Sequence, residues 1–450
     1  MNHHNFKKVT ILGAARSGLA AARLLQSKNA RVFVSEIRSA RDKQPEIEAL
    51  KEIGVDFECG EHSEKIFEAD WIILSPGIST KSEIVRKIRS KKIPFLSELE
   101  LAYRFCRGPI IAITGSNGKS TTTALLGEMF KQAGKKHVVA GNIGYPFSDA
   151  VRQMDSETTA IVETSSFQLE TIEQFKPDLG VLLNVTPDHL DRHTNFKEYL
   201  KTKLRLFKNQ TEKDYTIFNS DDKATDSAIR SLNLQSKSVQ FHTTKRVERG
   251  CFVETGRIKF QFEQKRFDVL AANEIALPGI HNLSNALAAT AAALLAGIPV
   301  EAVAATLKNF SGLEHRLEFV RELNGVKYVN DSKATNLESM RAGLNSFQQP
   351  LVVIAGGRAK EDDFRRIQKT ISNKVKKMIL IGEAADKISG ALQNGVLATK
   401  AATLKEAVKE AQTSAGEGEV VLLCPGCSSF DMFENFEDRG RQFRELVLNL

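Results

Sequence analysis

Residues 110–121 constrain this chain more than any other segment. Four apolar residues, Ile110–Ile113, predict a buried strand, and the apolar positions within 125–130 predict an amphipathic helix after it. Between them stands Thr-Gly-Ser-Asn-Gly-Lys-Ser-Thr. Its two glycines let successive backbone N–H groups face one anion, and the helix N-terminus adds partial positive charge. The segment therefore predicts a nucleoside triphosphate site.

The side chains of this loop support that interpretation. Lys119 can reach the terminal phosphates, and the hydroxyl of Ser120 or Thr121 can hold Mg²⁺. The spacing is not the full Walker pattern, because Ile113 stands where a glycine five residues before Gly118 is expected. The alternative is a glycine-rich turn that binds nothing. The strand before the loop, the helix after it and the Gly-Lys-Ser triplet together favour the nucleotide site.

Composition predicts a large globular enzyme. A chain of 450 residues is too long for one core, so two to four domains are expected. The net charge of +8 is scattered and suits anionic small molecules at least as well as nucleic acid. No run of 18 apolar residues and no signal-peptide core is present, which predicts a cytoplasmic protein without membrane insertion. Cys424 and Cys427 have the spacing of a redox motif, but a turn with two incidental thiols is the favoured interpretation.

Strands and helices alternate along nearly the whole chain, which predicts parallel α/β sheets. The first unit opens with a strand at Val9–Leu12 and the turn Gly13–Gly18, which is Rossmann-like except that Ala15 replaces the middle glycine. Glu36 ends the next strand, where a ribose hydroxyl would bind. A second loop on the same edge, at 75–78, follows a strand at 71–74. This pattern predicts a pocket shaped for a nucleotide and is only weak support for a dinucleotide.

The alternation restarts twice. It resets after Gly108-Pro109, and further strands are expected at 160–163 and 179–184. The stretch from Thr216 to Glu274 has few helix signals and is predicted to be a small β-rich insertion. A third unit begins near Val326, with strands at 351–354, 378–381 and 420–423.

Two residues at strand ends in the central block are candidates for metal chemistry. Glu163 ends a strand, where a carboxylate can meet the Mg²⁺ of the phosphate loop, although an exposed strand-end glutamate is equally compatible with its position. His189 follows the next strand and could be a metal ligand, a base or a helix cap; taken alone, capping is favoured.

Lys203 is the most unusual residue of the central block. On a helix it falls within the apolar stripe of Phe196, Leu200 and Phe207. Burial of an ammonium group is costly unless it is paired. Carbamylation by CO₂ would turn this lysine into an anionic ligand for Mg²⁺, but periodicity alone favours a side chain that extends to the surface.

The third unit carries two loops of interest. Asn330–Asn336 follows a strand and precedes a helix, with acid, hydroxyl and cation adjacent, and Gly356–Lys360 offers bare N–H groups with two cations. Either could be a connecting turn. Their presence on one sheet edge favours an anionic ligand such as an amino-acid carboxylate or a phosphate.

Taken together, these motifs closely resemble the Mur ligases over essentially the whole chain. The phosphate loop is common to the wider family, which includes folylpolyglutamate synthetase. More discriminating motifs are Ser165–Glu170, His281–Asn285, His315-Arg316 and Asp331–Asn336. The last of these is similar to the D-glutamate-adding members. The chain departs from those members at two positions: Glu36 stands where they often have Asp, and Ala15 replaces a frequent glycine.

The resemblance implies an α/β protein of three domains. These are a Rossmann-like domain at 1–97 for the UDP substrate, a central P-loop-type ATPase domain at 98–312 with the small β insertion, and a Rossmann-like domain at 313–450 that closes over the cleft. It implies an enzyme of peptidoglycan precursor synthesis that uses ATP to join D-glutamate to UDP-N-acetylmuramoyl-L-alanine, through an acyl phosphate and a tetrahedral intermediate.

The resemblance also implies a role for individual residues. The residues implied at the reacting groups are Lys119, Glu163, His189 and Lys203. The implied ligands of two Mg²⁺ ions are Ser120 and Glu163 for one, and His189 and carbamylated Lys203 for the other. The implied ATP site comprises Gly115, Ser116, Asn117, Gly118, Lys119, Ser120, Thr121, Asn285, Arg316 and Asp331. The implied UDP-substrate site comprises Ala15, Arg16, Ser17, Glu36, Arg38, Ser75, Gly77, Asn142 and His189. The implied D-glutamate site comprises Lys333, Thr335, Lys360, Ser429 and Phe436.

Two other functions stay open at this point. One is a different amide ligase of the same superfamily, which a panel of amino acids would distinguish. The other is a nucleotide-dependent dehydrogenase or a P-loop switch protein, in which Gly13–Gly18 would bind NAD. We expect a monomer whose partners are small molecules rather than nucleic acid.

Overall fold

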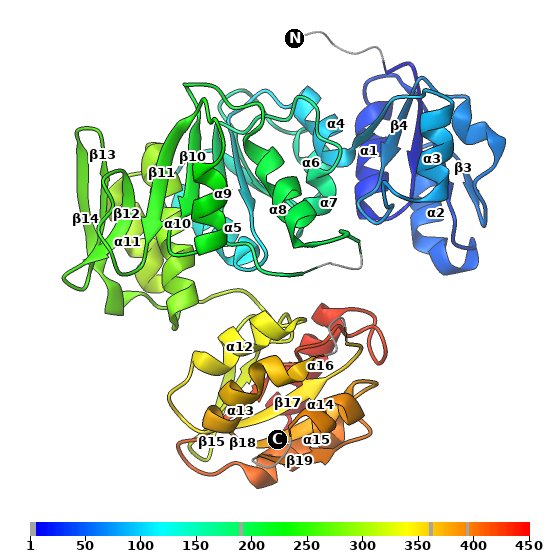
Figure 1. The fold of residues 1–450 in the computed structure, drawn as a ribbon. Helices are drawn as coiled ribbons and strands as arrows, with labels where there is room; N and C mark the ends of the chain where they lie inside the picture. The colour runs from blue at the N-terminus through cyan, green and yellow to red at the C-terminus, as the bar shows by residue number, and fades with distance from the viewer. Residues whose placement is uncertain (1–5, 189–191, 360–362, 393–395) are drawn as a thin grey trace. The chain divides into compact units, whose positions relative to one another are not determined.

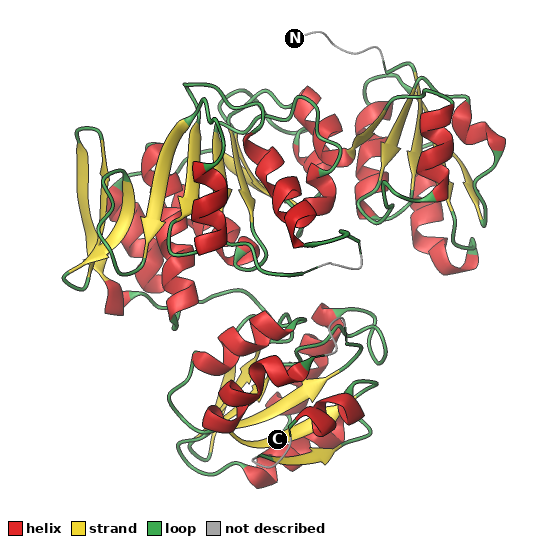
Figure 2. Cartoon of the chain, in the orientation of Figure 1, coloured by secondary structure: helices red, strands yellow, loops and turns green. Residues whose placement is uncertain are grey.

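The computed structural model describes residues 6–188, 192–359, 363–392 and 396–450. Two compact units divide the chain: residues 1–274 with 284–308, and residues 275–283 with 309–450. Figure 1 shows the elements of each unit, and Figure 2 shows helices against the strands of each sheet. In the residues described, no helix combines the length and the apolar character needed to cross a bilayer.

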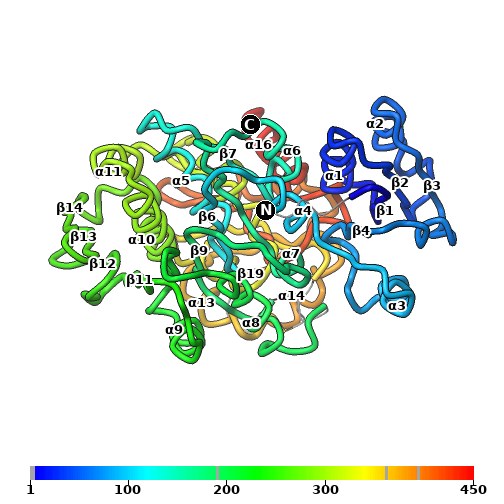
Figure 3. Tube along the Cα trace, turned by 90° about the horizontal axis from the view of Figure 1, so that it is seen from above, coloured from blue at the N-terminus to red at the C-terminus, as the bar shows by residue number. Residues whose placement is uncertain are grey.

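The N-terminal part of the first unit is a parallel five-stranded sheet in the order β3-β2-β1-β4-β5. Its strands are β1 (Lys8–Leu12), β2 (Arg31–Glu36), β3 (Asp56–Cys59), β4 (Trp71–Leu74) and β5 (Phe95–Ser97). Its helices are α1 (Arg16–Gln26), α2 (Gln44–Glu52) and α3 (Glu83–Ser90), with 3₁₀ turns η1 (Arg41–Lys43) and η2 (Glu64–Phe67). The view in Figure 3 shows α1 beside β1 and β2. The predicted Rossmann-like opening is confirmed.

Helix α4 (Glu98–Phe105) leads into a second, nine-stranded sheet in the order β14-β13-β12-β11-β10-β9-β6-β8-β7. The strands are β6 (Ile110–Thr114), β7 (His137–Gly141), β8 (Thr159–Glu163), β9 (Leu179–Leu182), β10 (Tyr215–Asn219), β11 (Lys237–His242), β12 (Gly250–Glu254), β13 (Arg257–Phe262) and β14 (Lys265–Ala271). Among the strand pairs described for this sheet, β12–β13 and β13–β14 are antiparallel and the others are parallel.

The helices of this part begin with α5 (Lys119–Gln132), α6 (Phe147–Ala150), α7 (Ser166–Leu169) and α8 (Phe196–Leu204). They continue with α9 (Lys223–Arg230), α10 (Ile280–Leu295) and α11 (Val300–Asn309), and 3₁₀ turns lie at η3 (Arg205–Phe207) and η4 (Ala272–Glu274). The predicted β-rich stretch is not a separate layer: its strands extend the central sheet, because β10 pairs in parallel with β9. It also holds helix α9, which begins where Asp222 accepts a hydrogen bond from Thr225 N.

One apolar cluster runs through both sheets of the first unit. It extends from Val9, Ile11 and Leu24 in the N-terminal part to Ala112 and Val162 in the central part. Helices α1 and α6 contribute to the connection, and the Arg23 guanidinium pairs with the Asp149 carboxylate at 2.6 Å. The two sheets therefore share one apolar core within the first unit.

The second unit is a six-stranded sheet in the order β15-β16-β20-β17-β18-β19. The strands are β15 (Glu318–Leu323), β16 (Val326–Asn330), β17 (Leu351–Gly356), β18 (Val375–Ile381), β19 (Leu397–Lys400) and β20 (Val420–Leu423). The helices are α12 (Leu337–Asn345), α13 (Gln368–Lys374), α14 (Ala385–Ala391), α15 (Leu404–Ser414) and α16 (Phe436–Leu448), with the 3₁₀ turn η5 (Phe364–Ile367). All pairs are parallel except β15 with β16. The predicted third α/β unit is confirmed, while the boundaries at 97 and 312 stay predictions.

Candidate active site

The phosphate loop has the predicted strand–turn–helix form. Strand β6 ends at Thr114, and α5 begins at Lys119 after Gly118, whose φ is +87°. A Cβ at Gly118 would lie 2.2 Å from Oδ1 of Asn285. Glycine is therefore required by both the left-handed backbone and the close approach of this asparagine.

Hydrogen bonds connect the phosphate loop to the segment that follows β9. Ser116 N donates to the Asn184 carbonyl oxygen at 2.9 Å, and Asn117 N donates to Asn184 Oδ1 at 2.9 Å. Ser116 Oγ donates to the Thr186 carbonyl oxygen at 3.0 Å. These bonds fix the loop before any ligand arrives, which lowers the ordering cost of phosphate binding.

Two lysine side chains converge on this loop. Lys119 Nζ donates to the carbonyl oxygens of Gly115 and Ser116, each at 2.8 Å. Lys203 Nζ also donates to Gly115 O at 2.8 Å and lies 4.5 Å from the ring centre of Tyr199. Lys203 is 1% exposed, so the side chain that reaches the surface, which periodicity alone favoured, is the wrong interpretation. Desolvation, and then repulsion from Lys119, lower the Lys203 pKa well below its ordinary value.

Glu163 lies at the carboxyl end of β8, beside β6, with Ile113 opposite it in the register. Its Oε1 accepts a hydrogen bond from Asn142 Nδ2 at 3.0 Å, whereas its Oε2 is buried and has no hydrogen-bond partner among the described residues. An exposed strand-end glutamate is therefore the wrong interpretation, because this side chain is 1% exposed.

The donors present fit a magnesium ion. A buried carboxylate oxygen without a donor is costly and suits a hard cation. Ser120, the second predicted ligand, is buried in the first turn of α5. Among the residues described, no group of three His, Cys, Asp or Glu side chains forms a metal cage.

The predicted UDP-substrate residues of the N-terminal sheet lie at its carboxyl edge. Ala15 is the N-cap of α1, and Arg16 and Ser17 are in its first turn, while Arg38 and Gly77 are exposed. Ser75 Oγ donates to the Gly13 carbonyl oxygen at 3.1 Å, which ties the two predicted loops together.

Both carboxylate oxygens of Glu36 already accept hydrogen bonds from the backbone, so this side chain is not simply available to bind a ribose. Its Oε2 accepts from Ala14 N at 2.8 Å, and its Oε1 accepts from Arg38 N at 3.0 Å. The carboxylate therefore braces the glycine-rich turn, and its contact with a ribose stays a prediction.

Arg316 and Asp331 belong to the second unit. Arg316 lies between His315 and Leu317, whose φ angles are +62° and +45°. Such left-handed backbone is strained for a bulky residue and is found at functional sites. Asp331 Oδ1 accepts from Leu317 N at 3.3 Å, and desolvation raises the Asp331 pKa to about 7, against the opposing charge of Arg316.

The predicted D-glutamate residues that the structure describes lie on neighbouring loops of the second unit. Lys333 Nζ is 4.2 Å from the Phe436 ring centre, and Ser332 Oγ donates to the Phe436 carbonyl oxygen at 2.8 Å. Thr335 N donates to the Lys333 carbonyl oxygen at 2.8 Å. Ser429 is 1% exposed, and within the part of the chain that the structure describes its Oγ has no hydrogen-bond partner. Two predicted site residues, His189 and Lys360, lie outside the described residues.

The two cysteines at 424 and 427 follow strand β20 in a turn, as the favoured interpretation expected. Both are free and fully buried. Burial raises the Cys427 pKa to about 12 and that of Cys424 well above its ordinary range. A buried, protonated thiol is a poor nucleophile, so the site does not have the form of a redox pair.

Two residues near the candidate site were missed by the sequence analysis. Tyr199 carries Lys203 over its ring, and its hydroxyl lies 3.1 Å from Ser116 Oγ. Arg439 is 0% exposed and donates to Ser332 Oγ and to the Cys427 carbonyl oxygen. The sequence signal that singled out Lys203, a cation within an apolar helical stripe, also applies to Arg439. On α16, Arg439 stands in a buried stripe with Phe443 and Val447.

Models of known families match successive parts of the chain. The MurD N-terminal domain matches residues 8–84, the Mur ligase middle domain matches 113–293, and the Mur ligase glutamate ligase domain matches 315–427. Solved structures share the fold: a pseudomurein peptide ligase type C from Methanothermus fervidus has a TM-score of 0.62 at 20% identity, over 98% of this chain and 99% of that one. The alanine ligase MurC from Thermotoga maritima also has a TM-score of 0.62, at 18% identity and with the same coverage.

Sequence relatives cover nearly the whole chain. Two proteins named UDP-N-acetylmuramoylalanine–D-glutamate ligase, from Thermoanaerobacter pseudethanolicus and Alkaliphilus metalliredigens, are 44% and 41% identical to it. Each alignment spans 99% of this chain and 98% of the relative. With three family models in order along the sequence and relatives this similar over its full extent, this protein belongs to the Mur ligase family.

Proposed function

We propose that this chain uses ATP to join D-glutamate to the alanyl carboxylate of UDP-N-acetylmuramoyl-L-alanine, a step of peptidoglycan precursor synthesis. The substrates are those in the names of relatives 39–44% identical to it. One observation supports the ATP-dependent chemistry: the phosphate loop and a buried carboxylate follow neighbouring strands. The loop follows β6, and Lys119 donates a hydrogen bond to its Gly115 carbonyl oxygen. Glu163 ends the adjacent strand β8, and its Oε2 has no hydrogen-bond partner among the described residues.

The reaction must first activate a poor electrophile. A carboxylate oxygen of the substrate bonds to the γ-phosphorus of ATP while the bond to ADP breaks, which gives an acyl phosphate. The amine of D-glutamate then attacks the carbonyl carbon, and the tetrahedral intermediate expels inorganic phosphate with that oxygen. The proton lost from the amine passes to a base or to solvent.

Lys119 and the phosphate-loop N–H groups would neutralise the charge that develops on the phosphoryl oxygens. Ser120 and Glu163 would hold a magnesium ion, which when bound polarises the phosphoryl group. Asn142, through its bond to Glu163, would orient that carboxylate. Asn285, beside Gly118, would lie at the nucleotide. Arg316 and Asp331 are also proposed to bind ATP.

Lys203 is proposed to react with CO₂ and to become a carbamate that serves a second Mg²⁺ together with His189. Burial and the nearby Lys119 favour the neutral amine that carbamylation requires. The reaction forms an N–C bond and releases one proton. A neutral lysine that only supports the Gly115 carbonyl is the competing role.

The remaining assignments concern the other substrates. Ala15, Arg16, Ser17, Arg38, Ser75 and Gly77 are proposed to bind the UDP substrate, with Glu36 bracing their loops. Lys333, Thr335, Lys360, Ser429 and Phe436 are proposed to surround D-glutamate. We further propose a cytoplasmic monomer that binds no nucleic acid.

A product assay tests the substrates directly. The purified chain is incubated with ATP, Mg²⁺, UDP-N-acetylmuramoyl-L-alanine and one amino acid at a time: D-glutamate, L-glutamate, D-aspartate, L-alanine or a diaminopimelate. Mass spectrometry should find the D-glutamyl product alone. A product with another amino acid and none with D-glutamate would assign the chain to a different amide ligase.

A further inference from the structure

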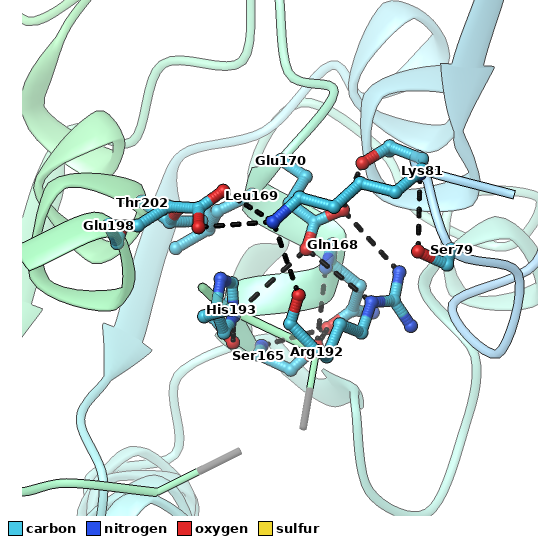
Figure 4. A network of polar contacts seen from close by, with 12 residues as sticks. Ser79, Lys81, Ser165, Gln168, Leu169, Glu170, Arg192, His193, Glu198 and Thr202 are labelled. Carbon is cyan, nitrogen blue, oxygen red and sulfur yellow. Dashed lines mark hydrogen bonds and ion pairs between the residues drawn. The ribbon is translucent and has the colours of Figure 1, made fainter. Parts of the chain in front are cut away.

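The loop between β4 and α3 is tied to the start of the lysine-bearing helix α8. Lys81 Nζ lies 2.9 Å from Thr194 Oγ1 and 2.9 Å from Glu198 Oε1, and 3.4 Å from the Arg192 carbonyl oxygen. Figure 4 shows this side chain reaching from its own loop to the opposite segment. Three acceptors for one ammonium group define its position far more closely than a single surface ion pair does.

Arg192 makes the reciprocal connection. Its guanidinium donates to the carbonyl oxygens of Pro76 and Ile78, the latter at 2.9 Å, and lies 3.9 Å from the Phe167 ring centre. Glu170 faces both sides, because its Oε2 accepts from Thr80 Oγ1 at 3.0 Å and its Oε1 lies 3.5 Å from Arg192 Nε. Lys81 of the loop thus contacts the segment before α8 and its first turn, and Arg192 of that segment contacts the loop in return.

The same segment positions Lys203. Glu198 N donates to the N-cap Asn195 Oδ1 at 2.9 Å, and Thr202 Oγ1 donates back to the Glu198 carbonyl oxygen at 2.9 Å. Tyr199, next to Glu198, lies under Lys203 and reaches Ser116 of the phosphate loop. A shift of the first turn of α8 would therefore move Lys203 and the support of the phosphate loop together.

Lys81 lies near the end of the loop between β4 and α3. Ser75 and Gly77, which we expect to bind the UDP substrate, lie at the beginning of the same loop. We propose that Lys81, together with Arg192, is a positioning residue that couples occupation of this loop to the placement of Lys203 and the phosphate loop. The inference rests on the proposed UDP-substrate site and on the proposed role of Lys203. It predicts that UDP substrate and nucleotide bind cooperatively and that this cooperativity passes through the Lys81–Glu198 contact.

A pair that only stabilised the fold would change the melting temperature when it is removed, whereas a pair that couples two binding sites would change ligand binding. The Lys81 and Glu198 side chains are 50% and 37% exposed, and exposed pairs contribute little to folding stability. Loss of the pair should therefore leave the melting temperature nearly unchanged while it disturbs function. Lys87 offers a matched control, since it forms an exposed ion pair with Glu83 on α3, at 2.9 Å, in the same part of the chain.

The test compares Lys81→Met with Lys87→Met in the full-length chain. Calorimetry measures the affinity for a non-hydrolysable ATP analogue, with and without saturating UDP-N-acetylmuramoyl-L-alanine. In the wild type and in Lys87→Met the substrate should tighten nucleotide binding by on the order of tenfold. In Lys81→Met this enhancement should be lost, with affinity for the analogue alone unchanged and kcat reduced by roughly tenfold.

A second part of the test exchanges the charges of Lys81 and Glu198. Lys81→Glu should lose the enhancement, and the double variant Lys81→Glu/Glu198→Lys should regain part of it, because the ion pair is restored in reverse. Equal cooperativity and kcat in Lys81→Met and Lys87→Met would overturn the inference. If the wild type makes no D-glutamyl product, the proposed function fails, whereas the binding comparison still decides whether Lys81 couples the two sites.

Discussion

The side-chain nitrogens of Lys119 and Lys203 both lie 2.8 Å from one atom, the carbonyl oxygen of Gly115. Two ammonium groups this close repel each other, and the buried one, Lys203, has its pKa lowered. The pair therefore consists of a half-buried lysine, Lys119, suited to binding phosphates, and a fully buried amine, Lys203, suited to a covalent change. This division underlies the first two predictions.

Lys119→Ala should keep the fold and lose most activity. The side chain contacts the loop that receives the transferring phosphate, and loss of one such donor raises the barrier by about 3–4 kcal/mol, which is roughly a hundredfold to a thousandfold in kcat. Circular dichroism checks the fold, and phosphate release checks the rate. Near-normal turnover with an intact spectrum would remove Lys119 from the mechanism.

Lys203→Ala should be nearly inactive, and a small carboxylic acid in the buffer should restore part of its rate by supplying the missing oxygens. Lys203→Arg should not recover, because a guanidinium cannot be carbamylated and remains charged. The measurement is kcat as a function of added acetate or formate, with Lys201→Ala, an exposed position on the same helix, as the control. A fully active Lys203→Arg enzyme would show that the residue acts only as a cation.

The strand–loop–helix of residues 110–132 could be predicted because its signals are local: an apolar run, glycines that permit unusual backbone, and an amphipathic helix. Lys203 and Glu163 could be singled out for a related reason, since periodicity places Lys203 within an apolar stripe and Glu163 stands at the end of a strand. Neither signal decides that the side chain is buried, because a lysine can extend to the surface and a strand-end glutamate can be exposed. Their contacts with Gly115 and Asn142 could not be predicted, because those partners are 88 and 21 residues away in sequence.

Other features have weaker local signals. Strands such as β3 and β19 are short edge strands with partly exposed residues, so their hydrophobic pattern does not separate them from loops. Helix α9 interrupts a β-rich stretch and is specified mainly by its Asp222 cap. The membership of 216–274 in the central sheet depends on the long-range β9–β10 pairing, which no local pattern encodes.

Ser429→Ala should separate binding from stability. The Ser429 hydroxyl is buried and has no partner in residues 6–188, 192–359, 363–392 and 396–450, so its removal should leave the unfolding free energy unchanged or raise it by up to about 1 kcal/mol. If the hydroxyl binds the D-glutamate carboxylate, the KM for D-glutamate should rise roughly tenfold, the effect of losing one hydrogen bond to a charged group. Ser389→Ala, exposed on α14, is the control and should change neither quantity. An unchanged KM in Ser429→Ala would exclude this contact.

Glu98 should make stability fall as the pH rises. It is the first residue of α4, and its Oε1 accepts a hydrogen bond from Ser148 N at 2.6 Å. Its Oε2 is buried, and no described residue donates a hydrogen bond to it. Desolvation raises its pKa from 4.5 to about 7. The native state therefore binds more protons than the unfolded state between pH 4.5 and 7, and this contribution to stability is lost as the pH rises through that window.

Glu98→Gln keeps an acceptor for Ser148 N and removes the charge. Denaturant unfolding should show it to be more stable than the wild type by about 1–3 kcal/mol at pH 8 and nearly equal to it at pH 4.5. Glu98→Ala, which lacks the acceptor, should be destabilised at acidic pH. The same stability difference between Glu98→Gln and the wild type at both pH values would contradict a titrating Glu98.

The central claim is that ATP activates the alanyl carboxylate by phosphorylation, and an oxygen-18 label in that carboxylate tests it most directly. The labelled UDP-N-acetylmuramoyl-L-alanine is turned over with ATP, Mg²⁺ and D-glutamate, and the released phosphate is analysed by mass spectrometry. Because the oxygen that attacks the γ-phosphorus departs with the phosphate, each phosphate released should carry one oxygen derived from the carboxylate, and release should depend on D-glutamate. Unlabelled phosphate, or phosphate released equally without D-glutamate, would contradict the account.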